Sequence, residues 1–287
     1  MNIFDRSSAR RRLILHADDF GMCRSTNEAI LDLWRRGAIT STTLMVNCPW
    51  SLQAAKAAVL DPSLDVGVHL TSTSEWDAYK WRPVLQGQPV NTLVDAFGYF
   101  PPDTGHMPGV DRGQLRAELI AQIELARRMG VDPTHLDNHM GSLRGGRDEL
   151  LVELAAEFGL PIRFTARPAY PSGREAEIAA LAREKGVLHP DYVIGLPFSY
   201  GADEDYESVR ENVLTLLRGL EPGLTEMLFH PSLDTDELKG ITDTWRFRRF
   251  DYELFLDPLV QSVIQEESIV LTGWRELRDL QRGQARA

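Results

Sequence analysis

Short apolar segments alternate with helical patterns along almost the whole chain. In the first unit, the apolar residues 13–17 are followed by Ile30, Leu31 and Trp34 at helical spacing, and Gly37 ends the pattern. The alternation predicts parallel strands, because each helix carries the chain back to the start of the next strand. Seven or eight repeats in a single rhythm favour a closed α/β barrel over an open doubly wound sheet.

The repeated units extend over most of residues 1–287, which we interpret as a single domain. A capping box formed by Ser25 and Glu28 is expected to begin the first helix. The other expected helices span residues 51–60, 115–129, 148–158, 174–185, 206–217 and 252–265. The expected strands span residues 13–17, 39–46, 64–70, 134–139, 162–165, 192–194, 226–229 and 269–271.

The chain is acidic, with a formal net charge of -11, and would repel the phosphate backbone of a nucleic acid. The arginines near the N-terminus precede only Leu13, Ile14 and Leu15, an apolar run too short for a signal peptide or a membrane span. We therefore expect a cytoplasmic protein with neither a nucleic acid nor a membrane as its partner. Cys23 and Cys48 lack the spacing of a zinc knuckle or a redox pair, and are expected to be free thiols.

Residues 71–111 break the rhythm with a connection of roughly forty residues. So long a connection inside a compact domain is usually functional or disordered, and its aromatic content argues against disorder. The aromatics are expected to form a ligand platform, a satellite hydrophobic cluster or a subunit contact in a homo-oligomer. They are Trp76, Tyr79, Trp81, Phe97, Tyr99 and Phe100.

Ionisable residues lie at or just beyond the ends of predicted strands, although they are spread over more than two hundred positions. The carboxyl ends of parallel strands converge at one mouth of a barrel, where active sites are built. Carboxylates and imidazoles gathered there can bind a divalent cation and leave positions open for water and substrate. The pattern therefore predicts an open metal site suited to hydrolysis. The residues are Asp18, Asp19, His69, Asp137, His139 and His230.

Several of these residues also have a purely structural interpretation. An aspartate after a strand often caps the next helix, but the neighbouring carboxylates of Asp18 and Asp19 would repel one another at a buried mouth. A cation or a proton is the usual means of tolerating such a pair. Taken alone, His69 is interpreted as a core histidine, and His230 could simply end its strand.

The segment 134–139 carries the densest set of ligating side chains. Side chains alternate along a strand, so His135, Asp137 and His139 are expected on one face. Three such side chains on one face of a parallel strand are hard to bury without a function, and the segment therefore strengthens the prediction of a metal site.

Together these motifs resemble the YdjC-like carbohydrate deacetylase family, which includes chitooligosaccharide and diacetylchitobiose deacetylases. The similarity runs from about Leu13 to Leu280, and the ordered set is far more specific than any one motif. It implies a distorted (β/α) TIM-like barrel of seven to eight parallel strands. The motifs are ADDFG at 17–21, ITSTTLMVN at 39–47, DVGVHLT at 65–71, THLDNH at 134–139 and FHP at 229–231.

The resemblance implies a metal-dependent hydrolase that removes the acetyl group from an N-acetylated sugar. Carried over residue by residue, it makes Asp19, His69 and His139 the metal ligands, Asp18 the general base and His230 the general acid. One divalent ion is expected, magnesium or zinc in the first place. Manganese, cobalt and nickel are also compatible with mixed Asp and His ligation.

Asp137, Trp76 and Trp81 are the predicted sugar contacts, and the aromatic segment is expected to fold over the barrel mouth. Many relatives continue the fourth motif as a histidine-rich run, whereas here His139 is followed by MGSL, so the substrate contacts on that rim differ.

Two alternatives stay open at this point. The first is a hydrolase of another amide or of a phosphate ester, although a phosphate would favour more basic residues than the isolated Arg144, Arg147 and Arg163. The second is an inactive sugar-binding barrel, which would not need the adjacent Asp18 and Asp19.

Overall fold

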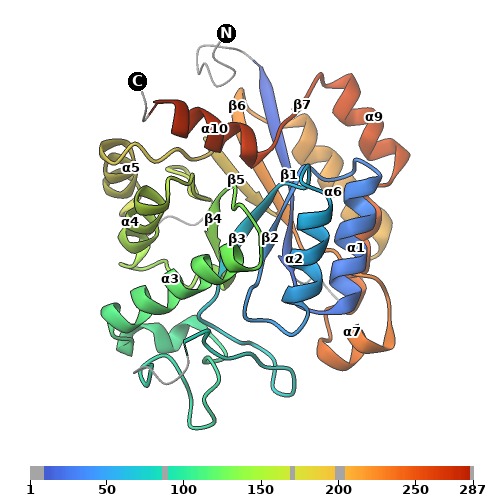
Figure 1. Ribbon diagram of the computed structural model, residues 1–287. Coiled ribbons are helices and arrows are strands. Elements are labelled where there is room, and N and C mark those ends of the chain that lie inside the picture. The colour runs from blue at the N-terminus through green and yellow to red at the C-terminus, as the bar shows by residue number, and fades with distance from the viewer. Residues whose placement is uncertain (1–9, 86–89, 169–171, 198–203, 285–287) are drawn as a thin grey trace.

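The computed structural model describes residues 10–85, 90–168, 172–197 and 204–284, and shows a curled parallel sheet surrounded by helices (Figure 1). Within the described residues the sheet has seven strands in the order β4-β3-β2-β1-β6-β5, and β7 also pairs with β1. This is a distorted (β/α) barrel in one α/β domain, as predicted. The strands are β1 (Arg11–Phe20), β2 (Ser41–Leu44), β3 (Val66–Leu70), β4 (Leu136–Asn138), β5 (Tyr192–Gly195), β6 (Gly223–Phe229) and β7 (Val270–Leu271).

The distortion lies between β4 and β5, where the strand predicted at 162–165 does not form. That segment contributes a single bridge, between Leu136 and Ile162, and one further backbone hydrogen bond from the Ile162 N–H to the Leu188 carbonyl. Pro161 precedes it and has no N–H to donate to a ladder. The wall of the barrel is therefore irregular here, and Arg163 lies in the irregular part.

Helices follow most strands and cover the outside of the sheet (Figure 1). The predicted helix at 252–265 is two helices, because Pro258 begins the second. The helices are α1 (Arg24–Arg35), α2 (Ser51–Leu60), α3 (Arg112–Arg128), α4 (Asp148–Phe158), α5 (Glu175–Glu184), α6 (Tyr206–Arg218), α7 (Asp236–Ile241), α8 (Trp245–Leu254), α9 (Pro258–Glu266) and α10 (Trp274–Gln284), with 3₁₀ turns η1 (Thr104–Gly109) and η2 (His139–Gly141).

The predicted capping box at the start of α1 is wrong. The N-cap is Cys23, whose side chain makes no capping hydrogen bond. Glu237 of α7 instead accepts hydrogen bonds from the backbone N–H groups of Arg24 and Ser25. A carboxylate from a distant helix therefore satisfies the donors at this helix end, where the partial positive charge favours an anion.

The 71–111 segment lies beyond the carboxyl ends of the strands, at the bottom of Figure 1, as predicted. Its residues 86–89 are outside the described part. Glu118 of α3 anchors the segment through hydrogen bonds from the N–H groups of Val84 and Leu85, and Tyr79 donates to the carbonyl of Met22. These contacts hold the segment at the mouth of the barrel.

Trp274 at the start of α10 lies at the opposite end of the barrel interior. Its ring stacks on His135 with centroids 4.4 Å apart, and it is completely buried. Burial lowers the pKa of His135 well below its usual range, so this imidazole is neutral and suited to stacking. Gly67 of β3 also lies against His135, since a Cβ at this position would be only 2.3 Å from the ring.

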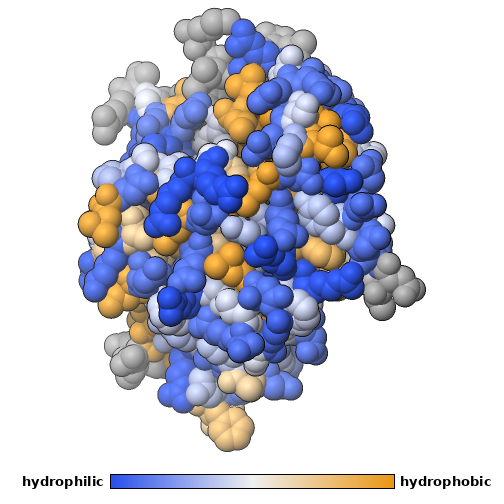
Figure 2. All heavy atoms as spheres, turned by 90° about the vertical axis from the view of Figure 1, so that its right-hand side faces the viewer, coloured by the Kyte–Doolittle hydropathy of each residue, from blue (hydrophilic) through white to orange (hydrophobic). Residues whose placement is uncertain are grey.

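One outer face, formed around α1, α7 and α9, is mostly hydrophilic and has only small separate hydrophobic patches (Figure 2). Cys23 and Cys48 are buried free thiols, as predicted. Within the residues that the structure describes, no helix is both long enough and apolar enough to cross a membrane.

We predict that Gly67→Ala destabilises the fold, because the new methyl group must displace His135 or Trp274 in a close-packed interior. The expected loss is about 1–3 kcal/mol in the free energy of unfolding, measured by urea denaturation. The matched control is Gly240→Ala in α7, where a Cβ would meet nothing within 4 Å and stability should be unchanged or higher. Equal stability of Gly67→Ala and the wild type would contradict the packing described.

Candidate metal centre at the barrel mouth

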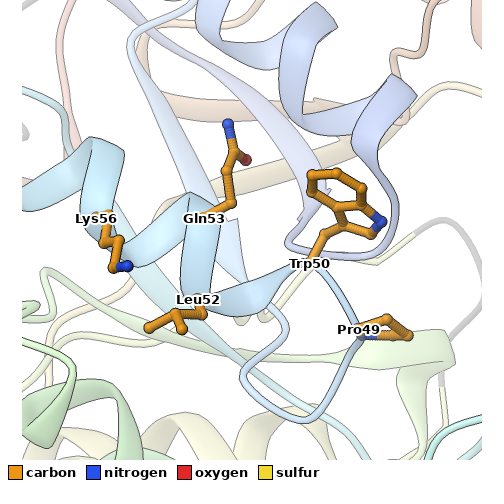
Figure 3. A pocket seen from close by; sticks show the side chains of 5 residues that line it. All are labelled: Pro49, Trp50, Leu52, Gln53 and Lys56. Atoms are coloured by element: carbon orange, nitrogen blue, oxygen red, sulfur yellow. The ribbon is translucent and has the colours of Figure 1, made fainter.

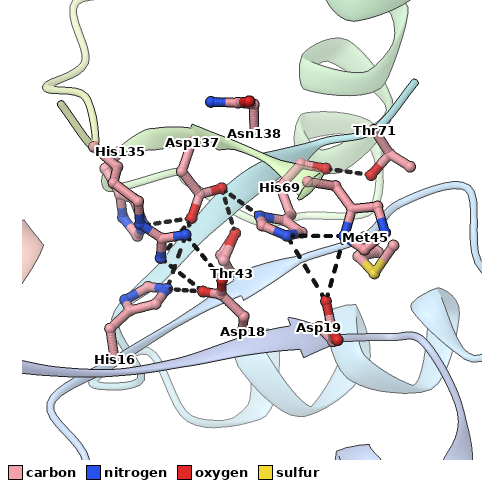
Figure 4. A network of polar contacts seen from close by, with 12 residues as sticks. His16, Asp18, Asp19, Thr43, Met45, His69, Thr71, His135, Asp137 and Asn138 are labelled. Carbon is pink, nitrogen blue, oxygen red and sulfur yellow. Dashed lines mark hydrogen bonds and ion pairs between the residues drawn. The ribbon is translucent and has the colours of Figure 1, made fainter. Parts of the chain in front are cut away.

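Asp19, His69 and His139 come together at the carboxyl ends of β1, β3 and β4. Figure 4 shows two of them, Asp19 and His69, pointing toward one another. The Asp19 Oδ1 atom lies 3.7 Å from His69 Nε2 and 3.6 Å from His139 Nδ1, and the two nitrogens are 3.3 Å apart. All three side chains are buried. The residues predicted as ligands from separate motifs therefore present one oxygen and two nitrogens to a common point.

A local irregularity of β1 turns two neighbouring carboxylates toward the mouth. In a regular strand, Asp18 and Asp19 would point to opposite faces. Here the pairing of β1 with β2 shifts register between Ala17 and Phe20, and Asp19 has a left-handed φ of 69°. Such a backbone is unfavourable for a residue other than glycine, and it is frequently found at functional sites. Met140, directly after His139, is also left-handed, with a φ of 52°.

Each imidazole of the group is oriented by a carboxylate on its other nitrogen. His69 Nδ1 lies 2.7 Å from Asp137 Oδ1, and His139 Nε2 lies 3.0 Å from Glu75 Oε2. Figure 4 shows His69 between Asp137 on one side and Asp19 on the other. Carboxylates that hold the outer nitrogen of a histidine are a regular feature of metal sites, because they fix the ring and its tautomer.

Asp18 is held by Arg163, which donates two hydrogen bonds to its carboxylate at 2.6 and 2.9 Å. The same guanidinium lies 2.8 Å from Asp137 Oδ2 and donates from Nε to Glu226 Oε2 at 3.0 Å. Burial acts to raise the pKa of Asp18, but Arg163 and the nearby imidazoles outweigh it and hold that pKa well below the usual range. Asp18 is therefore ionised.

Asp19 is paired with a second buried arginine, Arg248 of α8. The Arg248 guanidinium donates to Oδ2 at 2.9 Å. Burial acts to raise the pKa of Asp19, but Arg248 and the nearby imidazoles outweigh it and lower that pKa to about 2. The other oxygen, Oδ1, is buried and has no hydrogen-bond partner among the described residues. An orphaned carboxylate oxygen is costly unless something positive meets it.

The residues fit a divalent cation. Metal–ligand bonds of about 2.0–2.2 Å place neighbouring ligand atoms about 3.0–3.5 Å apart, close to the separations found here. The surroundings are also negative, since Asp137 and Asp18 overcome the effect of burial and raise the pKa of His69 to about 9. The orphaned Asp19 Oδ1, the oriented imidazoles and the negative field all favour a cation at this point.

Two other groups of side chains are close enough to be considered as metal sites. In one, Asp18 and Asp137 accompany His69, but both carboxylates already pair with Arg163. In the other, His16 and His135 face Asp137 at 3.8 and 3.9 Å. The guanidinium of Arg163 on the same carboxylate would repel a cation in either group. The Asp19 group fits best.

His230, at the end of β6, lies across the mouth from the ligand group. Its Nε2 is 3.5 Å from Asp18 Oδ2, and its backbone N–H donates to Asp251 Oδ2 at 2.8 Å. Burial raises the pKa of Asp251 to about 6, against the opposing effect of that hydrogen bond. The predicted base and the predicted acid therefore face one another.

A cavity of about 800 Å³ opens onto these groups. Asp18, His69, His139 and His230 line it, together with Arg163 and Arg248. A second hollow of about 410 Å³ lies at the start of α2 (Figure 3), and none of the predicted site residues lines it. It is lined by Pro49, Trp50, Leu52, Gln53 and Lys56.

The two tryptophans predicted to contact a sugar differ in position. Trp76 lines the large cavity, is half-buried and lies beneath the guanidinium of Arg248. Trp81 is only 2% exposed, and its Nε1–H donates to the carbonyl of Thr73. Its ring meets Trp76 and His139 edge-on. Trp81 therefore supports the site from behind, and Trp76 faces the space that a ligand would fill.

Three charged residues of the site were not identified from the sequence: Glu75, Glu226 and Arg248. Arg163 was considered only as an isolated arginine and not as the partner of Asp18. Glu226 could have been found from the sequence. It lies two positions before Leu228 and four before His230, so it falls on the same, inward face of a buried strand. Glu75 and Arg163 lie just beyond or within predicted strands. Arg248 has no local signal, because a helix far along the chain brings it to Asp19.

Known proteins share this architecture. A family model described as YdjC-like protein matches residues 12–266. A carbohydrate deacetylase from Thermoanaerobacter pseudethanolicus is 32% identical over 268 residues, which cover 93% of this chain and 99% of that protein. A carbohydrate deacetylase from Enterococcus faecalis is 33% identical over 276 residues, with coverage of 94% and 99%.

Among solved structures, that of a candidate cellobiose-phosphate cleavage protein from Enterococcus faecalis matches with a TM-score of 0.79 and 28% identity, covering 93% of this chain and 99% of that one. These matches agree with the resemblance indicated by the motifs. Because the family match extends from the first strand to the end of α9, the protein belongs to the YdjC-like family.

Proposed function

We propose that the protein is a carbohydrate deacetylase that uses one divalent metal ion to hydrolyse the N-acetyl group of a sugar. One observation carries the proposal: an orphaned carboxylate oxygen and two oriented imidazole nitrogens share a point beside an ionised aspartate and a histidine. The names of the relatives at 32% and 33% identity support the reaction and the class of substrate.

In this proposal Asp19, His69 and His139 hold the ion, and Glu75 and Asp137 orient the two imidazoles. Asp137 was predicted to contact the sugar, but it has no exposed surface, and the positioning role suits its burial better. When bound, the ion supplies a Lewis acid, which lowers the pKa of water and polarises a carbonyl.

Asp18 accepts a proton from the attacking water. Arg163 fixes the carboxylate of Asp18 in place through two hydrogen bonds, as a base must be held within reach of the proton it removes. His230 then delivers a proton to the leaving nitrogen, since an amine leaves poorly as an anion. The products are acetate and a free amino sugar.

The arginines of the cavity favour an amide over a phosphate ester as the substrate. Arg163 is neutralised by Asp18, Asp137 and Glu226, and Arg248 by Asp19. Neither guanidinium has its charge available for the oxygens of a transferring phosphoryl group, which require such cations.

We predict that His139→Ala and Asp19→Gly each lower the affinity for zinc or magnesium by more than about 100-fold, since each removes a ligand. Glycine is chosen at position 19 because it tolerates the left-handed backbone there. Metal titration by calorimetry is the measurement, and His106→Ala, which changes an exposed histidine outside the candidate ligand group, is the control. Full stoichiometric binding by both variants would remove these residues from the ligand set.

We expect Asp18→Asn to keep the metal but to lose roughly 100- to 10,000-fold in kcat, the contribution of a positioned base. The amide preserves the shape of the side chain while removing its basicity. Acetate release from a panel of N-acetylated mono- and oligosaccharides, with and without a chelator, is the assay. A turnover close to that of the wild type would make Asp18 structural, and chelator-resistant release would make the metal dispensable.

The two tryptophans should respond differently to alanine. Trp76→Ala should raise KM for an oligosaccharide several-fold with little change in stability, because Trp76 faces the cavity. Trp81→Ala should lower the free energy of unfolding by about 3–5 kcal/mol, as for other buried aromatics. Kinetics, chemical denaturation and size-exclusion chromatography separate the cases. A change of oligomeric state in Trp76→Ala would favour a subunit contact instead.

A further inference from the structure

A line of buried polar contacts connects the closed end of the barrel to Asp18. The Trp274 indole N–H donates to Glu226 Oε1 at 3.2 Å, and Arg163 Nε–H donates to Glu226 Oε2 at 3.0 Å. Arg163 in turn makes its two hydrogen bonds to Asp18. Glu226 is completely buried, at the midpoint of this line.

The shape of a guanidinium makes the position of Glu226 important. The group is planar and rigid, so fixing the Nε–H direction also fixes the directions of the terminal N–H groups. With Nε–H held by Glu226, both terminal nitrogens of Arg163 reach Asp18, at 2.6 and 2.9 Å. Without an acceptor at Nε, the plane could rotate about the side-chain bonds, and the paired contact with Asp18 would be lost.

A purely structural role does not account for this glutamate well. A buried ion pair contributes little net stability compared with apolar side chains of similar size, because both charges must be desolvated. Asp18 and Asp137 already supply two carboxylates to the one guanidinium of Arg163. A third buried carboxylate is not needed to neutralise Arg163. Glu226 is, however, the carboxylate that accepts the hydrogen bond from Arg163 Nε–H.

We propose that Glu226 is a positioning residue for the reaction: it orients Arg163, and Arg163 orients the carboxylate of Asp18. The inference rests on the proposed function, in which Asp18 accepts a proton from water. Glu226 is not one of the candidate metal ligands. Its Oε1 also lies 3.6 Å from His16 Nδ1, but its hydrogen bond to the guanidinium is the contact through which it acts in this proposal.

The test compares two changes at the same position. Glu226→Met removes the acceptor while keeping the length of the side chain. Glu226→Gln combined with Trp274→Phe keeps an oxygen for Arg163 Nε–H, and the phenyl ring removes the indole donor that the glutamine nitrogen would otherwise face. Zinc content, unfolding temperature, kcat and KM for acetate release are measured for both.

Glu226→Met should lower kcat roughly 10- to 100-fold, part of what a positioned base supplies, while KM and zinc content stay within about threefold of the wild type. The double variant should keep kcat within about fivefold. In an Arg163→Lys background, Glu226→Met should have no further effect on kcat, because lysine has no Nε–H to orient.

An equal loss of kcat in both variants, or additive losses with Arg163→Lys, would overturn the proposal. Crystal structures provide a readout that does not depend on activity: the paired contact from Arg163 to Asp18 should be lost in Glu226→Met and kept in the double variant. If the wild type released no acetate, the proposed function would fail, and the structures alone would decide the role of Glu226. A paired contact retained in Glu226→Met would overturn it.

Discussion

Negative charge buried inside the barrel determines how the site is built. Asp18, Asp19, Asp137 and Glu226 are almost completely shielded from solvent, and the arginines that meet them are Arg163 and Arg248. A buried charge is tolerated only when it is paired, and these carboxylates outnumber the guanidinium groups that contact them. The site therefore keeps an excess of buried negative charge, which favours a bound cation. The same imbalance raises the pKa of His69 in the protein without a bound ion.

The irregular parts of the fold are those that deliver the compensating charges. Arg163 comes from the gap in the barrel wall between β4 and β5, and Arg248 comes from α8, which lies in the connection between β6 and β7. In a regular eight-stranded wall, the residue beside Asp18 would be an inward-pointing side chain of a continuous strand. Here the irregular segment places the guanidinium of Arg163 there. In the same way, the shift of register in β1 and the left-handed Asp19 allow neighbouring aspartates to face one mouth. The 71–111 segment adds Glu75, which holds His139.

The sequence predicted which residues meet where the alternation of strands and helices alone determined their positions. Strand-end positions of a parallel barrel converge, so Asp18, Asp19, His69, His139 and His230 could be placed together without knowing any contact. Prediction failed where a distant partner or a proline decided the local structure. Glu237 replaced the expected capping box, the segment at 162–165 formed a single bridge in place of a strand, and Pro258 divided one expected helix into two. The partners of the aspartates were missed because an arginine reaches its carboxylate through tertiary folding, which leaves no trace in spacing.

In the proposed function, a divalent cation lies between Asp19, His69 and His139. Anomalous diffraction from crystals of the zinc-loaded protein, recorded on both sides of the zinc edge, tests it most directly. One strong peak is expected about 2.0–2.2 Å from Asp19 Oδ1, His69 Nε2 and His139 Nδ1. A peak between His16 and His135, or zinc found only at the surface, would contradict it.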